Sequence, residues 1–229
     1  MIEPNHQLES GSGCGRSAGP LQPLPRLWLA VLCAAAPVAA VAGPLVPRPQ
    51  LAAGERVEAQ LSADFDGDHA PDLAYIARSD EHRELRVVLA NRPARPQRLP
   101  LDPYPLGDGT LAVNRTVLVM EDLTGGTTAV SSLRRFRYDP GLRAMRVIGI
   151  DATLYSRTYA HDGVETSWNL LTGQVITRQL RLHRGTAGRD ESDAAYDKTA
   201  ERRTRRLSPA LRLEQSPDPD DVLGWPGAE

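Results

Sequence analysis

The sequence predicts an all-β protein, built mainly from antiparallel sheet, with one Asp-rich loop and at most one short helix near the C-terminus. Two observations indicate this fold class. Across residues 55–182 the apolar runs are short, and turn residues separate them at intervals of roughly eight to twelve residues. The 229 residues also include 19 Gly and 19 Pro, which break a chain into short elements.

The expected strands follow one another along this region, and turn-forming residues such as Gly, Pro, Asn and Asp punctuate the chain between them. They are Val57–Leu61, Leu73–Ala77, Leu85–Ala90, Leu111–Met120, Val130–Tyr138, Ala144–Ile150, Leu154–Tyr159, Glu165–Leu170 and Val175–Leu182. After them, Ala194–Leu207 has the spacing of one amphipathic helix.

The clearest predicted hairpin joins residues 130–138 to residues 144–150 through Asp139-Pro140-Gly141. Pro fixes φ at the turn, and we expect Gly141 to take the left-handed position. In the first strand, Val130, Phe136 and Tyr138 share one parity and Arg135 and Arg137 share the other, which predicts one buried and one solvent-exposed face.

The N-terminal residues have the pattern of a secretory signal peptide. Arg26 precedes an apolar run over residues 27–42, which ends in the small-x-small pattern Ala40-Val41-Ala42. The run is short for a membrane anchor and Pro37 interrupts it. Lipidation at Cys33 is an alternative, although Ala30-Val31-Leu32 is a poor lipobox. We therefore expect a periplasmic or extracellular protein.

The sequence divides into four segments. Residues 1–25 are long and polar for the start of a leader, which suggests a start codon further downstream. We expect a signal peptide at 1–42, a Pro-rich extended segment at 43–54, a β-rich domain at 55–184, and a polar, charged C-terminal segment at 185–229.

Charge and cysteine content exclude several classes of protein. Lys+Arg is 27 and Asp+Glu is 29, so the formal net charge of −2 argues against nucleic-acid binding by bulk positive charge. Both cysteines, Cys14 and Cys33, lie in the leader. The mature chain is therefore expected to have no disulfide, no Cys-ligated zinc and no membrane span. Its oligomeric state is left open.

The strongest chemical motif is the acidic run from Ala63 to Ala74. Asp64, Asp66 and Asp68 alternate, and Asp72 follows four residues later. Carboxylates this close repel one another unless a cation neutralises them, and the carbonyl of Ala70 offers a further oxygen. Such a set of hard oxygen ligands suits Ca²⁺ better than Mg²⁺ or zinc. The alternative is a solvated acidic turn without metal.

This run resembles the calcium loop of FG-GAP and VCBS-type repeats. The resemblance implies that the side chains of Asp64, Asp66, Asp68 and Asp72 and the backbone of Ala70 are the ligands. The family usually has Gly where His69 stands, at a position expected to need positive φ, so a weak site is expected. The loop occurs once, and we do not expect a propeller.

The chain around the loop resembles small exported proteobacterial β-sheet proteins, some of which are periplasmic immunity proteins against cell-wall-hydrolase effectors of type IV secretion. The likeness rests on segments within residues 64–177, namely Gly125-Gly126-Thr127, Phe136-Arg137-Tyr138, Ile148-Gly149-Ile150-Asp151, Tyr155-Ser156-Arg157 and residues 165–173. It implies that the protein acts by binding and that its partner is a secreted cell-wall-hydrolase toxin.

The sequence motifs give little support for a catalytic function. The sequence has no H-E-x-x-H, no G-x-S-x-G and no P-loop or dinucleotide fingerprint. Glu121-Asp122 and Glu165 are available as a carboxylate pair for a glycosidase. The rival interpretation is thus a glycan-binding or hydrolytic domain of the cell envelope.

A candidate partner surface lies within residues 152–170. Tyr155, Arg157 and Tyr159 are expected on one strand face, and Trp168 follows in the next strand. Tyr, Arg and Trp are the most frequent anchors of protein interfaces. The alternative for Trp168 is a place in the core.

Overall fold

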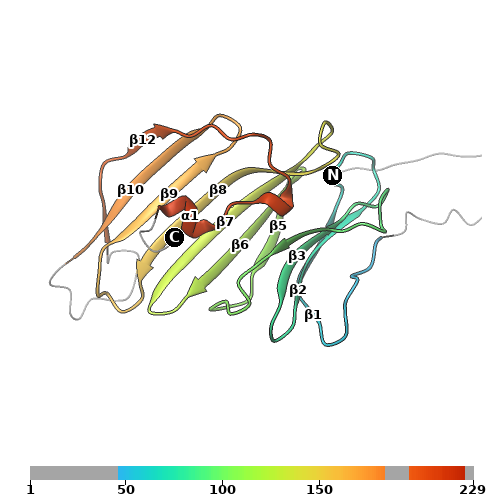
Figure 1. Ribbon diagram of the computed structural model, residues 1–229, viewed down its shortest axis with the longest axis horizontal. Coiled ribbons are helices and arrows are strands. Elements are labelled where there is room, and N and C mark those ends of the chain that lie inside the picture. The colour runs from blue at the N-terminus through green and yellow to red at the C-terminus, as the bar shows by residue number, and fades with distance from the viewer. Residues whose placement is uncertain (1–45, 184–195, 225–229) are drawn as a thin grey trace, which may run out of the picture. The chain divides into compact units, whose positions relative to one another are not determined.

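The computed structural model describes residues 46–183 and 196–224, which belong to one compact unit. The predicted signal peptide lies outside these residues. Most of the described chain is strand, arranged in two antiparallel sheets, with one short α-helix (Figure 1). The predicted all-β class, with at most one short helix near the C-terminus, is confirmed for these residues.

The small sheet has four strands in sequence order. They are β1 (Arg56–Ala63), β2 (Asp72–Arg78), β3 (Arg83–Val88) and β4 (Gln97–Pro100). Every residue of β2 from Asp72 to Ala77 is buried, because both faces of this strand are covered. β4 was not among the expected strands.

The large sheet has eight strands and is ordered β11-β10-β9-β8-β7-β6-β5, with β12 also paired to β10. The strands are β5 (Thr110–Asn114), β6 (Val117–Gly125), β7 (Thr128–Asp139), β8 (Ala144–Ser156), β9 (Gly163–Asn169), β10 (Gln174–Leu182), β11 (Tyr196–Lys198) and β12 (Arg202–Arg205). A 3-10 helix, η2 (Leu213–Gln215), and the helix α1 (Pro219–Leu223) follow.

Three predicted strands differ from the structure. Residues 111–120, expected as one strand, form the β5–β6 hairpin, because Arg115 takes a left-handed φ of 58° without a Gly or Pro to signal the turn. The strands expected at 144–150 and 154–159 are one strand, β8, which ends at Ser156. Asp151 does not interrupt it, because Arg135 and Ser167 on the neighbouring strands bind its carboxylate.

The prediction of a helix at Ala194–Leu207 is wrong. The described part of this segment forms β11 and β12, which pair with opposite ends of β10. The free edge of β10 offers unpaired backbone groups, and their hydrogen bonds outweigh a weak helical pattern. Between the two strands, Thr199 N also donates to Gln179 O at 3.0 Å.

The β7–β8 hairpin is confirmed, but its turn differs in detail. Arg143, with φ of 50°, takes the left-handed position that we expected for Gly141. The Asp139 side chain holds the turn by accepting hydrogen bonds from Gly141 N at 2.9 Å and Leu142 N at 3.2 Å. An Asx turn therefore replaces the predicted use of glycine.

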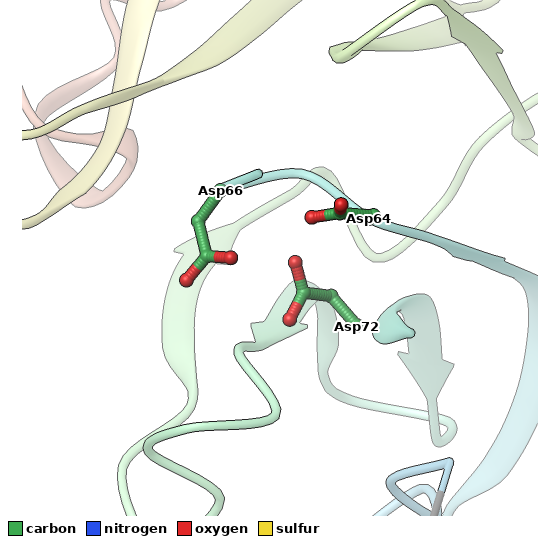
Figure 2. Close-up of side chains that lie close together, drawn as sticks. All are labelled: Asp64, Asp66 and Asp72. Carbon is green, nitrogen blue, oxygen red and sulfur yellow. The ribbon is translucent and has the colours of Figure 1, made fainter. Parts of the chain in front are cut away.

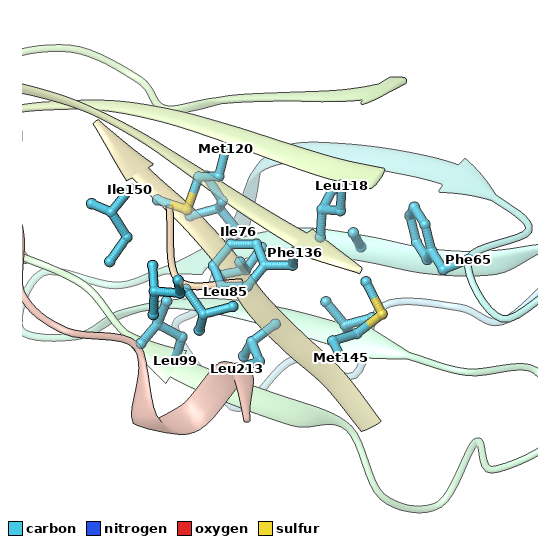
Figure 3. Packing of buried hydrophobic residues seen from close by; sticks show 14 of the residues in the cluster. Phe65, Ile76, Leu85, Leu99, Leu118, Met120, Phe136, Met145, Ile150 and Leu213 are labelled. Carbon is cyan, nitrogen blue, oxygen red and sulfur yellow. The ribbon is translucent and has the colours of Figure 1, made fainter. Parts of the chain in front are cut away.

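The main core lies between the two sheets (Figure 3). Ile76 and Leu85 of the small sheet pack in one cluster with Met120 and Phe136 of the large sheet. Leu213 of η2 belongs to the same cluster and is fully buried. Residues from the C-terminal segment thus complete a core that is formed mostly by strands.

The outer face of the small sheet is covered by the Pro-rich segment before β1. Gln50 N donates to the Tyr75 hydroxyl at 2.9 Å, and Gln50 O accepts from Arg86 Nη1 at 2.7 Å. Arg86 in turn pairs with Glu55. These contacts lie over Tyr75, which is buried together with Leu73 and Val88 in a second, smaller cluster.

Candidate functional site

The loop between β1 and β2 brings three carboxylates together (Figure 2). Asp64 and Asp66 lie in the loop, and Asp72 is the first residue of β2. Each contributes a carboxylate oxygen, and these oxygens all lie within 4.8 Å of one another. The group has the composition and spacing to hold a metal ion.

Backbone amides fix the positions of the carboxylates. Asp64 accepts from Gly67 N at 2.7 Å and from His69 N at 3.0 Å, which curls the loop around this side chain. Asp72 accepts from Phe65 N at 2.8 Å and from Ala90 N at 2.7 Å. Asp72 therefore ties the loop to the end of β3, and Phe65, 1% exposed, anchors the same loop in the main core.

The loop has left-handed backbone at two positions. Gly67 has φ of 82° and His69 has φ of 66°. The expectation that position 69 needs positive φ is confirmed. Left-handed φ is unfavourable for a residue with a Cβ, so His69 strains the loop more than the Gly of the resembling family would.

Asp68 lies beside the group of three rather than in it. Its Oδ1 accepts from Ala70 N at 2.8 Å and its Oδ2 accepts from Asn91 Nδ2 at 3.0 Å. Asn91 Nδ2 also donates to Asp66 Oδ2 at 2.7 Å. Sequence reasoning missed Asn91, which follows β3 and approaches the loop only through the pairing of β2 with β3. The ligand roles of Asp68 and Ala70 stay predictions.

The electrostatics of the loop favour a cation. Burial raises the pKa of Asp72, and the carboxylates of Asp66 and Asp68 raise it further. Within the described residues, no Arg or Lys forms an ion pair with the four aspartates of the loop. The exposed His69 is the basic residue that pairs with them there, with its Nδ1 3.8 Å from Asp64 Oδ2. A hard divalent cation would relieve this repulsion.

The predicted partner residues fall in different environments. Tyr155 is half-buried on β8, whereas Arg157 and Tyr159 lie beyond the strand, with Arg157 exposed and Tyr159 44% exposed. Trp168 is 4% exposed and belongs to the main core, in line with the alternative stated for it. Its Nε1 donates to Arg206 O at 3.0 Å, and the Arg206 guanidinium lies 4.4 Å from the ring centroid.

The face of the large sheet that carries Tyr155 has several polar contacts between neighbouring strands. Asp151 binds Arg135 Nη2 at 2.5 Å and the Ser167 hydroxyl at 2.6 Å. Glu165 pairs with Arg178 at 2.7 Å and with Lys198 at 2.8 Å. These residues lie on the side of the strands opposite to Phe136 and Trp168, so this is a polar surface with Tyr155 among its ion pairs.

The carboxylates considered for a glycosidase do not form a working pair. Glu121 on β6 and Glu165 on β9 are separated by β7 and β8, which places them roughly 14 Å apart or more. Paired glycosidase carboxylates lie about 5–9.5 Å apart. The partners of Glu165, Lys198 and Arg178, lower its pKa against the effect of burial, whereas a general acid needs a raised pKa.

Comparison with known proteins gave no match to a family model, to a curated protein or to a solved structure. In the part of the chain that the structure describes, no helix has the length and apolar character that crossing a membrane requires.

Proposed function

We propose that the β1–β2 loop binds Ca²⁺ and that the ion stabilises the fold. The observation that carries this proposal is the group of three carboxylates, one of them fully buried, without an Arg or Lys partner among the described residues. The set of oxygen donors, with carbonyls available in the loop, suits the high coordination number of calcium. The aspartate pattern and its resemblance to FG-GAP and VCBS-type loops support the same ion.

Thermal unfolding tests the calcium site. We expect millimolar Ca²⁺ to raise the melting temperature of the wild-type protein above its value in EDTA, and Asp66→Ala with Asp68→Ala to abolish the increase. Asp80→Ala is the matched control, because Asp80 is exposed in the turn between β2 and β3. Identical melting of the wild type in EDTA and in Ca²⁺ would refute the site.

The protein as a whole is proposed to be an exported, non-catalytic module that binds another protein, most specifically an immunity-type inhibitor of a secreted cell-wall hydrolase. The resemblance to small exported proteobacterial proteins supports this function. So does the exposure of Arg157 and Tyr159 at the end of β8. Arg157 Nη1 donates to Gly126 O at 3.4 Å, which links this segment to the neighbouring β6–β7 turn.

The inhibitor proposal needs an activity measurement as well as capture. The chain, purified from the periplasm of an expressing host, is used as bait for secreted proteins of its own organism, and captured hydrolases are assayed on peptidoglycan. We expect hydrolysis to fall as bait is added, and to recover with bait carrying Arg157→Ala and Tyr159→Ala. A captured hydrolase that stays fully active would contradict inhibition, and peptidoglycan binding by the bait alone would favour the glycan-binding alternative.

A further inference from the structure

A second polar site lies on the side of the large sheet that faces α1. A cavity of about 300 Å³ is bounded by β6, β7, the residues after β4 and the first turn of α1. Its charged lining includes Arg134 of β7, Asp102, and Asp218 and Asp220 at the start of α1. The volume is at the lower end of the range for small-molecule sites, so the cavity suits a small ligand rather than a polymer.

Arg134 is the unusual group in this cavity. The residue is 7% exposed, and its Nε and Nη1 atoms are buried with no hydrogen-bond partner among the described residues. Its register neighbours are Met120 on β6 and Ile150 on β8, which offer no counterion. Burial lowers the pKa of Arg134, and the charges of Asp218 and Asp122 offset this effect only in part.

The two acids whose charges act on Arg134, Asp122 and Asp218, form their hydrogen bonds with other groups. Both carboxylate oxygens of Asp122 accept from Arg83 at 2.9 Å. Asp218 Oδ1 accepts from Asp220 N at 2.9 Å and so caps α1. An arginine stays protonated, and a buried charge without an ion-pair partner is costly. An anionic group from outside the chain would therefore stabilise the guanidinium of Arg134.

The mouth of the cavity has the opposite character. Asp102, Asp218 and Asp220 are exposed there, and none of them forms an ion pair with an Arg or Lys of the described residues. Partial desolvation of the carboxyl group raises the pKa of Asp220 although the residue is exposed overall, and the carboxylates of Asp218, Asp221 and Asp102 add to the increase. A plain anion would be repelled by these aspartates, and a plain cation would leave Arg134 uncompensated.

We propose that this cavity binds a diamino acid of the lysine class, with the ligand carboxylate on Arg134 and its ammonium groups on Asp102, Asp218 and Asp220. The planar guanidinium can hold a carboxylate through two parallel hydrogen bonds. The excess of aspartates over arginine matches a ligand with more ammonium groups than carboxylates. This site is separate from the calcium loop and does not depend on the function proposed above.

Four small probes separate the possible ligands. Calorimetric titration of the full chain, saturated with Ca²⁺, uses L-lysine, L-alanine, glutarate and cadaverine, which is lysine without its carboxylate. We expect L-lysine to bind, and each other probe to bind at least about tenfold more weakly. Absence of lysine binding, or equal binding of any of the other three, would overturn the proposal.

Two variants and one control assign the binding to the named residues. Arg134→Met should reduce lysine affinity at least about tenfold, while the melting temperature without ligand stays equal or rises, since a buried unpaired charge has been removed. Asp220→Asn should also weaken lysine binding and provides the test if Arg134→Met fails to fold. Arg137→Met, an exposed arginine on the same strand, should bind lysine like the wild type. Unchanged affinity in Arg134→Met or in Asp220→Asn would refute the assignment.

Discussion

The terminal nitrogens of Arg83 donate to both carboxylate oxygens of Asp122, each at 2.9 Å, and so join β3 of the small sheet to β6 of the large sheet. The same guanidinium pairs with Glu58 of β1 at 2.7 Å. The side chains of Arg83 and Glu58 are fully buried, and that of Asp122 is 6% exposed. The interface between the sheets therefore contains a buried ionic chain of one guanidinium and two carboxylates beside its apolar core.

Replacing Arg83 with Met should be strongly destabilising. The substitution leaves the carboxylates of Glu58 and Asp122 buried without their shared cation, which costs about 3–5 kcal/mol in the free energy of unfolding. Arg98→Met is the control, because Arg98 is 48% exposed and its ion pair with Glu84 is a surface contact worth about 1 kcal/mol or less. Urea denaturation measures both, and equal losses would contradict a structural role for the buried chain.

Gly109 lies against this ionic chain and should not tolerate a side chain. A Cβ at this position would lie 2.7 Å from Arg83 Nη2 and 2.8 Å from Ile76 Cδ1, and Gly109 N donates to Glu58 Oε1 at 2.6 Å. Gly109→Ala should lower the free energy of unfolding by roughly 1–3 kcal/mol. Gly107→Ala in the same loop meets no atom within 4 Å and should be close to neutral in the same denaturation experiment.

The ion pair between Glu55 and Arg86 should make stability depend on acidic pH. The hydrogen bonds that Glu55 accepts from Arg86 lower the pKa of Glu55 from 4.5 to about 2. Because the folded-state pKa is the lower one, the stabilisation is complete above pH 4.5 and is lost as the pH falls towards 2.

Glu55→Gln tests this dependence. At pH 7 we expect the variant to be less stable than the wild type by about 2 kcal/mol, since it loses a charged hydrogen bond. Unfolding curves recorded across the acidic range should show the difference shrinking as the wild-type carboxylate is protonated. A difference that is constant with pH would show that the charge of Glu55 contributes nothing.

The C-terminal segment should be needed for stability because it supplies Leu213 to the core. Leu213 is 0% exposed, so Leu213→Ala should cost about 2–5 kcal/mol. Leu207 lies in the same segment but is 73% exposed, and Leu207→Ala should change stability by less than about 0.5 kcal/mol. Similar stabilities for the two variants would mean that the segment does not pack as described.

The sequence by itself determined the features that depend on neighbouring residues. Short apolar runs between turn residues predicted the antiparallel class, and Asp139-Pro140-Gly141 predicted the β7–β8 hairpin. The alternation of Asp64, Asp66 and Asp68, with Asp72 four residues later, predicted the acidic loop. These signals lie within a few residues of one another, so backbone preference and local charge repulsion are enough to produce them.

Tertiary structure alone decided the features that join distant segments. Asn91 reaches Asp66 only because β3 pairs with β2, and Trp168 is buried because the segment at Arg206 covers it. The residues expected as a helix became β11 and β12 because the edge of β10 lies beside them. The lack of a hydrogen-bond partner at Arg134 Nε and Nη1, within the described part of the chain, also depends on tertiary structure. The residues around Arg134 come from separate strands and from the first turn of α1. The packing of those elements cannot be predicted from a short stretch of sequence.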